Sequence, residues 1–157
     1  REAIALRPDE PEAYFNLGLA LNNSGHAVEA AQRYLEARER FQVGSEYWAK
    51  ATAGAFNMLG QEACAEVAKP EWWNDEALKA LSARVVRAAP DEAVANQMRA
   101  MVLAGQSRAP WEAGPRSVAE LREAATHFER AAALCPAPAG KADLAALAYC
   151  CRAASQA

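Results

Sequence analysis

The chain has 157 residues and a formal net charge of -3, with 52% hydrophobic and 24% charged residues, a composition typical of one globular, soluble domain. It holds 41 alanines but only one Ile, eight Val and two Thr, too few β-branched residues for a sizeable sheet, which predicts an all-α fold. No apolar run approaches the roughly 18–20 residues of a membrane helix, and no basic block marks a nucleic-acid-binding surface.

Apolar periodicity and turn residues place the expected helices in chain order. They cover residues 1–7, 11–23, 27–42, 45–58, 74–89, 91–104, 117–135 and 139–154. After the first, they form three antiparallel pairs and one closing helix, in which we expect Tyr149 to face inward. Asp91 and Ser117 are the expected N-caps of their helices, since both side chains can accept hydrogen bonds from backbone N–H groups.

Small and large residues recur at fixed intervals within 11–44. Gly18 and Ala30 allow two antiparallel helices to approach closely, and Gly25 suits the left-handed turn between them. The spaced positions are Tyr14, Leu17, Gly18, Leu21, Ala30, Tyr34 and Ala37, and part of the same pattern returns at Ala124, Phe128, Ala131 and Pro136. This pattern resembles the tetratricopeptide repeat, a 34-residue helix pair. The resemblance implies a right-handed α-solenoid of about three and a half repeats.

The repeat spacing treats 1–157 as a single domain with two interrupted repeats. Its parts are the end of a truncated repeat over 1–10, a repeat over 11–44, a repeat over 45–90 with an insertion near 60–74, a repeat over 91–136 with an insertion near 105–117, and a terminal helix within 137–157. The first residue is Arg rather than Met, so we expect the sequence to be a portion of a longer chain.

In tetratricopeptide proteins the first helix of each repeat lines a concave groove. The resemblance therefore implies that a partner peptide binds through Phe15, Asn16, Asn23, Lys50 and Asn57. An asparagine amide can both donate to and accept from a peptide backbone. The same offsets in the third repeat are Val94, Gln97, Met98, Met101 and Gly105. The clamp by which one subgroup holds a peptide carboxylate is not expected, because Glu46 stands where that subgroup has Lys.

Each insertion carries a proline-tryptophan element, one over 70–73 and one over 110–111. Both insertions leave the array between the first and second helix of a repeat, which predicts that they lie on the same edge. On one interpretation the tryptophans fold back and cover hydrophobic helix flanks. On the other, Trp72, Trp73 and Trp111 form a partner-binding edge with Trp73 exposed, since tryptophan is enriched at binding hot spots.

No catalytic, cofactor or metal site is expected. His127 lies on a helix beside Glu123 and Arg130, a setting typical of a structural histidine. Cys150 and Cys151 point to different faces of one helix, and no cysteines show C-x-x-C spacing, which argues against a redox pair and a zinc site. No nucleophile motif or phosphate-binding glycine loop occurs. The scarcity of cysteine suits a reducing compartment, so we expect an intracellular protein, in the cytoplasm or alternatively in an organelle.

The leading hypothesis for function is a non-catalytic protein–protein interaction module or assembly scaffold. It would bind a partner peptide or subunit in its groove, take no small-molecule substrate and serve as a subunit of a larger complex. The alternative is the regulatory or substrate-recruiting arm of a larger enzyme whose catalytic domain lies outside this sequence. The sequence does not separate the two, because a fold does not fix a function.

Overall fold

The computed structural model describes residues 10–106 and 111–157, and the helix expected over 1–7 lies outside them, as does Pro110. Within the described residues the chain forms seven α-helices and one short 3-10 helix, with no strand, so the all-α prediction is confirmed. They are α2 (Pro11–Asn23), α3 (Ala27–Arg40), α4 (Glu46–Leu59), η1 (Glu62–Cys64), α5 (Asp75–Ala88), α6 (Ala93–Ala104), α7 (Val118–Leu134) and α8 (Pro138–Ser155). No helix in this part of the chain is both long and apolar enough to cross a membrane.

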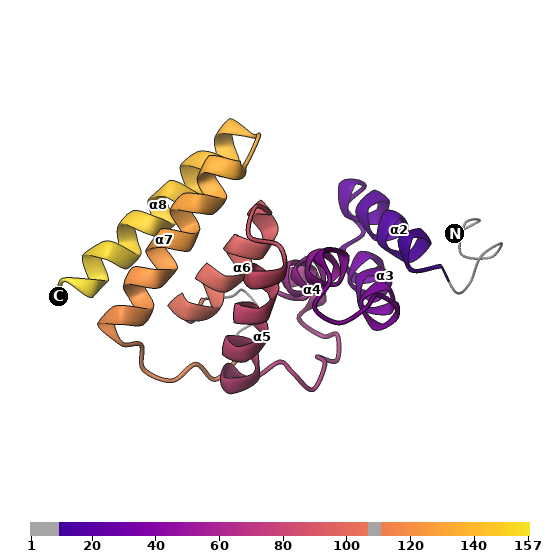
Figure 1. Ribbon diagram of the computed structural model, residues 1–157, viewed down its shortest axis with the longest axis horizontal. Helices are drawn as coiled ribbons and strands as arrows, with labels where there is room; N and C mark the ends of the chain where they lie inside the picture. The colour runs from indigo at the N-terminus through magenta and orange to yellow at the C-terminus, as the bar shows by residue number, and fades with distance from the viewer. Residues whose placement is uncertain (1–9, 107–110) are drawn as a thin grey trace.

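Helices that follow one another in the sequence lie side by side in space. The array is elongated, with α2 and α3 at one end and α7 and α8 at the other (Figure 1). α3 packs against both α2 and α4, and α7 packs against both α6 and α8. In the middle, α4 contacts α5 and α6, which joins the two ends of the array.

The helix boundaries follow from residues at the caps. Ser45 and Asn74 accept hydrogen bonds from backbone N–H groups in the first turns of α4 and α5. The predicted N-cap of α7, Ser117, is confirmed. The Ser117 hydroxyl accepts a hydrogen bond from the Glu120 N–H at 3.1 Å, and the Glu120 carboxylate accepts one from the Ser117 N–H at 3.0 Å. Gly25 has the positive φ of 82° that the predicted turn after α2 requires.

Two residue assignments made from the sequence are wrong. Glu92, not Asp91, occupies the N-cap position of α6. The Asp91 carboxylate instead accepts a hydrogen bond from Arg130 of α7 at 2.7 Å. Tyr149 is 76% exposed rather than inward, because α8 packs on α7 through a different face. The buried residues of that face are Leu144, Ala148 and Cys151.

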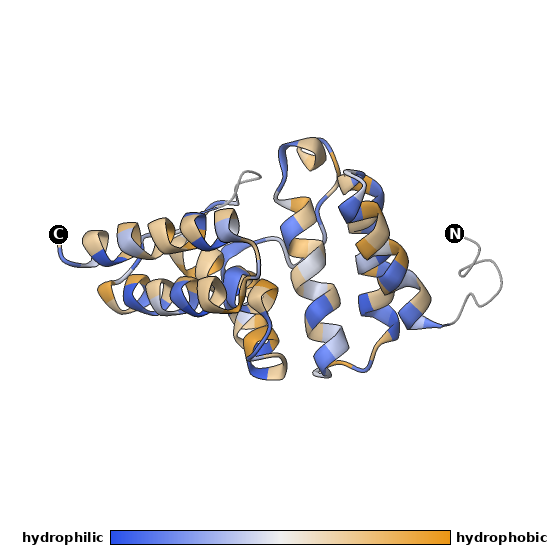
Figure 2. Cartoon of the chain, turned by 90° about the horizontal axis from the view of Figure 1, so that it is seen from above, coloured by the Kyte–Doolittle hydropathy of each residue, from blue (hydrophilic) through white to orange (hydrophobic). Residues whose placement is uncertain are grey.

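The core runs along the array and does not gather at one centre. Apolar and polar residues are mixed along the helices (Figure 2). The central helix α4 is buried on nearly all sides, with ten of its 14 residues buried. The central cluster joins α4, α5 and α6 with Trp111, and its large members are Trp48, Phe56, Leu78, Leu81, Val85, Met98, Val102 and Trp111. A second cluster joins α6, α7 and α8, and a third joins α3, α4 and η1.

Tyr34 of α3 is held between glycines of the two neighbouring helices. A Cβ atom at Gly18 of α2 would lie 2.9 Å from Tyr34 Cδ1, and one at Gly54 of α4 would lie 3.1 Å from Tyr34 Cε2. The tyrosine is 3% exposed, so its ring cannot move away into solvent. The missing side chains at Gly18 and Gly54 therefore set how closely α2, α3 and α4 approach one another.

Replacing Gly18 with leucine is expected to lower the free energy of unfolding by about 1–3 kcal/mol, because the new side chain would push against the buried Tyr34 ring. Urea unfolding followed by circular dichroism measures the change. Ala20→Leu is the matched control, since Ala20 lies exposed on the same helix. Equal losses in the two variants would contradict the close contact at Tyr34.

Candidate functional site

A pocket of about 150 Å³ gathers residues from α2, α4 and α6, the first helices of the three pairs, together with Tyr34 of α3. We call it the α2–α4–α6 groove. Its lining residues are Phe15, Leu19, Asn22, Tyr34, Lys50, Gly54, Asn57, Glu92, Val94 and Ala95. Three of the predicted groove residues, Phe15, Lys50 and Asn57, therefore lie together. Leu19 and Val94 add apolar surface that remains 40% and 38% exposed.

Lys50 is bound by carboxylates on both sides of the groove. Its Nζ lies 3.4 Å from Glu46 of its own helix and 3.4 Å from Glu92 at the start of α6. It also lies 4.7 Å from the centre of the Tyr47 ring. Burial disfavours the ammonium form, but the two carboxylates outweigh it, so the pKa of Lys50 is raised. Lys50 is therefore not a free cation for an anionic peptide terminus.

A second pocket, of about 420 Å³, extends the groove toward the carboxyl end of α4. It shares Asn57 with the first pocket, and its lining residues are Phe56, Asn57, Gly60, Gln61, Gln97 and Met101. Among the described residues, the side-chain amides of Gln61 and Gln97 donate only to methionine sulfurs, at 3.8 and 3.9 Å. Sulfur is a weak acceptor, so both amides remain available to a ligand.

Two predicted groove residues lie outside these pockets. Asn16 and Asn23 are exposed on α2, and Asn22 lines the groove instead. Burial raises the pKa of the Tyr34 phenol, and a hydrogen bond with Asn22 partly offsets that rise. Gln61 was not predicted because it lies in an insertion, where the repeat offsets do not apply.

The tryptophans of the two insertions meet over the central core. The Trp73 and Trp111 rings lie 6.2 Å apart, and the Phe56 ring of α4 lies 5.2 Å from Trp73 and 6.1 Å from Trp111. Trp111 is only 9% exposed, and Trp72 and Trp73 are half-buried. The two insertions thus lie on one edge, as expected. This packing supports the covering interpretation, and the partner-binding edge stays a prediction.

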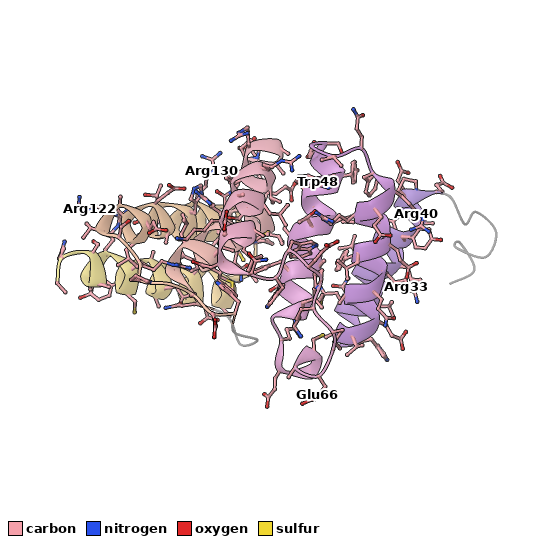
Figure 3. All side chains as sticks on the ribbon, turned by 90° about the horizontal axis from the view of Figure 1, so that it is seen from below. Arg33, Arg40, Trp48, Glu66, Arg122 and Arg130 are labelled. Atoms are coloured by element: carbon pink, nitrogen blue, oxygen red, sulfur yellow. The ribbon has the colours of Figure 1, made fainter. Side chains whose placement is uncertain are left out.

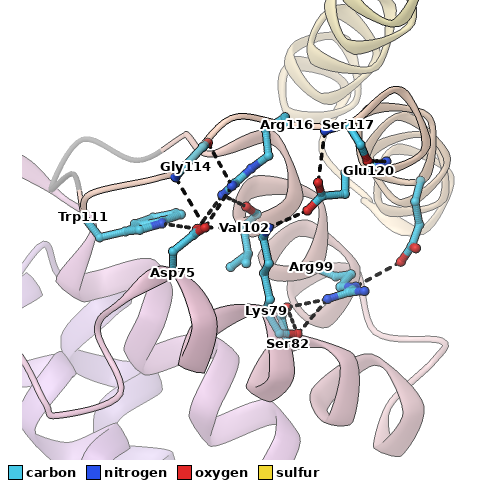
Figure 4. A network of polar contacts seen from close by, with 11 residues as sticks. Asp75, Lys79, Ser82, Arg99, Val102, Trp111, Gly114, Arg116, Ser117 and Glu120 are labelled. Carbon is cyan, nitrogen blue, oxygen red and sulfur yellow. Dashed lines mark hydrogen bonds and ion pairs between the residues drawn. The ribbon is translucent and has the colours of Figure 1, made fainter.

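Residues 111–117, which we call the strap, are fastened to the start of α5 by Asp75 (Figure 4). Its carboxylate accepts from Trp111 Nε1 at 2.8 Å and from Arg116 Nη1 and Nη2 at 3.0 and 2.5 Å. Arg116 Nη2 also donates to the Val102 carbonyl of α6 at 3.0 Å. The strap therefore joins α5 to α6 through one carboxylate and one guanidinium.

A second pair of charges continues this network (Figure 4). Lys79 Nζ of α5 lies 2.6 Å from Glu120 of α7. The hydrogen bonds from Arg116 are the main reason why the pKa of Asp75 lies well below its usual range. The bond from Lys79 is the main cause that lowers the pKa of Glu120 to about 2. Both carboxylates are therefore ionised near neutral pH.

His127 links α7 to α6. Its Nδ1 lies 2.9 Å from Asn96 Oδ1, while Asn96 Nδ2 donates to the backbone carbonyls of Pro90 and Glu92. Since the amide nitrogen is the donor there, Asn96 Oδ1 accepts and His127 Nδ1–H donates. Burial lowers the pKa of His127, although Glu123 opposes the shift. These contacts give His127 a structural role.

The cysteines and acidic residues gather into no further centre. Cys151 is buried while Cys150 is exposed, so the two point to different faces as predicted. Within 10–106 and 111–157, no three His, Cys, Asp or Glu side chains lie close enough together to hold a metal ion.

No protein-family model, curated protein or solved structure matches this chain. The resemblance to the tetratricopeptide repeat therefore stays a prediction based on residue spacing. A function for the chain has to be inferred from the chemistry of the groove.

Proposed function

We propose that this chain is a non-catalytic protein-interaction module that binds a partner peptide or subunit along the α2–α4–α6 groove. The observation that carries the proposal is the convergence of side chains from three successive helix pairs on two adjoining pockets. Apolar surface lines these pockets together with glutamine amides that donate only weakly, to methionine sulfurs, among the described residues, a combination suited to an extended peptide.

The same proposal includes the architecture. We infer a right-handed, tetratricopeptide-like superhelix with the groove on its concave side. Antiparallel helix pairs that pack in chain order support this inference. The contact of Gly18 with Tyr34 also supports it, because a small residue at that position is part of the repeat pattern.

The peptide would lie extended across the groove. The amides of Asn57, Gln61 and Gln97 would bind its backbone, since each amide both donates and accepts. Phe15, Leu19 and Val94 would receive one apolar side chain, and these lie at the other end of the groove. An isolated site of this size is expected to bind with micromolar affinity, about -8 kcal/mol.

The charged residues around Lys50 should also discriminate between peptides of different charge. Glu46 and Glu92 flank Lys50, so two carboxylates face one ammonium group. An acidic residue in the peptide would be repelled by this excess of negative charge, whereas an uncharged segment would not. Because the central cation is already paired, we expect the affinity to depend only weakly on salt.

The double variant Asn57→Ala and Gln97→Ala tests the amide contacts. The ligand is a peptide selected from a random library for binding to the unchanged chain. The double variant should bind this peptide at least about tenfold more weakly, which corresponds to a loss of about 1.4 kcal/mol in binding free energy. Isothermal titration calorimetry measures the affinity. Gln32→Ala is the control, since Gln32 is an exposed amide on α3 outside both pockets. Unchanged affinity in a double variant that keeps its helical content would reject the groove.

A further inference from the structure

Two arginines from different helices converge on one buried tryptophan. The guanidinium carbon of Arg38 of α3 lies 5.7 Å from the centre of the Trp48 ring, and that of Arg84 of α5 lies 5.3 Å from it. Arg38 also lies over Trp72 of the first insertion at 5.3 Å. Trp48 is 1% exposed and lies near the middle of the array (Figure 3). These cation–π contacts fix the positions of both guanidinium groups.

The arginines at this place have no ionic partner in the described part of the chain. Arg38 donates through Nε to the Thr52 hydroxyl at 2.9 Å, and no ion pair joins Arg38, Arg84 or Arg87 to a described carboxylate. Most other described arginines are paired with acids, and these are Arg33, Arg99, Arg116, Arg130 and Arg152. Unpaired positive charge therefore collects locally in a chain whose net charge is -3.

A pocket of about 170 Å³ opens beside these arginines, between the turn before α4 and the last turns of α5. Its lining residues are Gly44, Arg84, Arg87 and Ala88, none of which lines the groove. Arg84 and Arg87 are three positions apart on one helix, so they share a face, and both are exposed. A group displayed on the surface of another molecule can therefore reach them.

The positive charges of Arg38 and Arg84 lie close enough to repel each other. Burial is the main cause that lowers the pKa of Arg38, the charge of Glu39 opposes the shift, and the charge of Arg84 lowers the pKa further. A bound anion would relieve this repulsion, because it would place negative charge beside Arg84 and Arg87, which form no ion pair with a described carboxylate.

We propose that Arg84 and Arg87, flanked by Arg38, bind the phosphate group of a phosphorylated serine or threonine on a protein partner. Three cations without a paired carboxylate suit a group that carries nearly two negative charges better than a single carboxylate. The planar guanidinium fork donates two parallel hydrogen bonds to phosphate oxygens. This site is separate from the groove and does not depend on the proposed function.

The test titrates the full chain with N-acetyl-O-phosphoserine amide and, separately, with N-acetylserine amide at constant ionic strength. The readout is the NMR shift of the arginine Nε–Hε signals. We expect saturable shifts at Arg84 and Arg87 with the phosphorylated compound alone. Arg87→Gln should weaken binding about tenfold without unfolding the chain, because the exposed Arg87 side chain forms no ion pair with a described carboxylate. Glu39→Gln should strengthen binding, since it removes a carboxylate whose charge acts on Arg38.

Arg122 provides the matched control, because it is an exposed arginine of α7 far from Trp48 (Figure 3). Arg122→Gln should leave the titration unchanged. Equal shifts with the unphosphorylated compound, or at Arg122, would overturn the proposal. So would equally strong binding of acetate, which would mark a carboxylate site. Binding of phosphatidylserine vesicles without any response to phosphoserine amide would overturn it in favour of a membrane surface.

Discussion

Replacing Asp75 with alanine is expected to lower the free energy of unfolding by about 3 kcal/mol, one of the two largest effects expected in this chain. The change would leave the Arg116 guanidinium, whose side chain is 8% exposed, without its carboxylate. It would also remove the acceptor of the Trp111 indole N–H and release the strap from α5. Chemical denaturation of the chain measures the loss.

A double-mutant cycle measures the coupling energy between Asp75 and Arg116 apart from their other contacts. Because Asp75 and Arg116 form one unit, Asp75→Ala, Arg116→Ala and the double variant should lose similar amounts of stability. Asp143→Ala, at an exposed position of α8, is the control and should change stability by less than about 0.5 kcal/mol. Simple addition of the two single losses would contradict the coupling.

Trp111→Ala is expected to destabilise the chain by about 3–5 kcal/mol, because it opens a cavity beside Phe56 and Trp73 and removes a hydrogen bond to Asp75. Trp111→Phe keeps an aromatic ring in place but loses the hydrogen bond, so its loss should be smaller. Melting temperatures of both variants measure the effect.

Tyr149→Ala is the control for Trp111, since Tyr149 is an aromatic residue that is 76% exposed. Its melting temperature should stay close to that of the unchanged chain. If Trp111→Ala melted normally but bound a partner less well, the tryptophans would belong to a partner-binding edge instead of the core.

The sequence predicted most of the helices, because their signals are local. The stripe of Tyr14, Leu17 and Leu21, the cap at Ser117 and the turn at Gly25 each depend on residues within a few positions. Asp91 failed as a cap because its partner, Arg130, lies on another helix. A short window of sequence contains no sign of that competition.

The candidate site was predicted only in part, for the same reason. Repeat offsets placed Phe15, Lys50 and Asn57 in one groove. They did not predict that Glu92, from the next pair, neutralises Lys50, or that the insertion supplies Gln61. The bond between Asp75 and Arg116 joins residues 41 positions apart in the sequence. Such contacts depend on how the helix pairs stack, which the spacing within one repeat does not describe.

Chemical-shift mapping of a selected peptide on the isotope-labelled full chain tests most directly whether the α2–α4–α6 groove is the binding site. If it is, the largest shifts should fall on residues from three helices that come together at this groove. These are Phe15, Leu19, Lys50, Asn57 and Gln97. Shifts confined to α8 or to the strap over 111–117, with the groove signals unchanged, would contradict the proposed function.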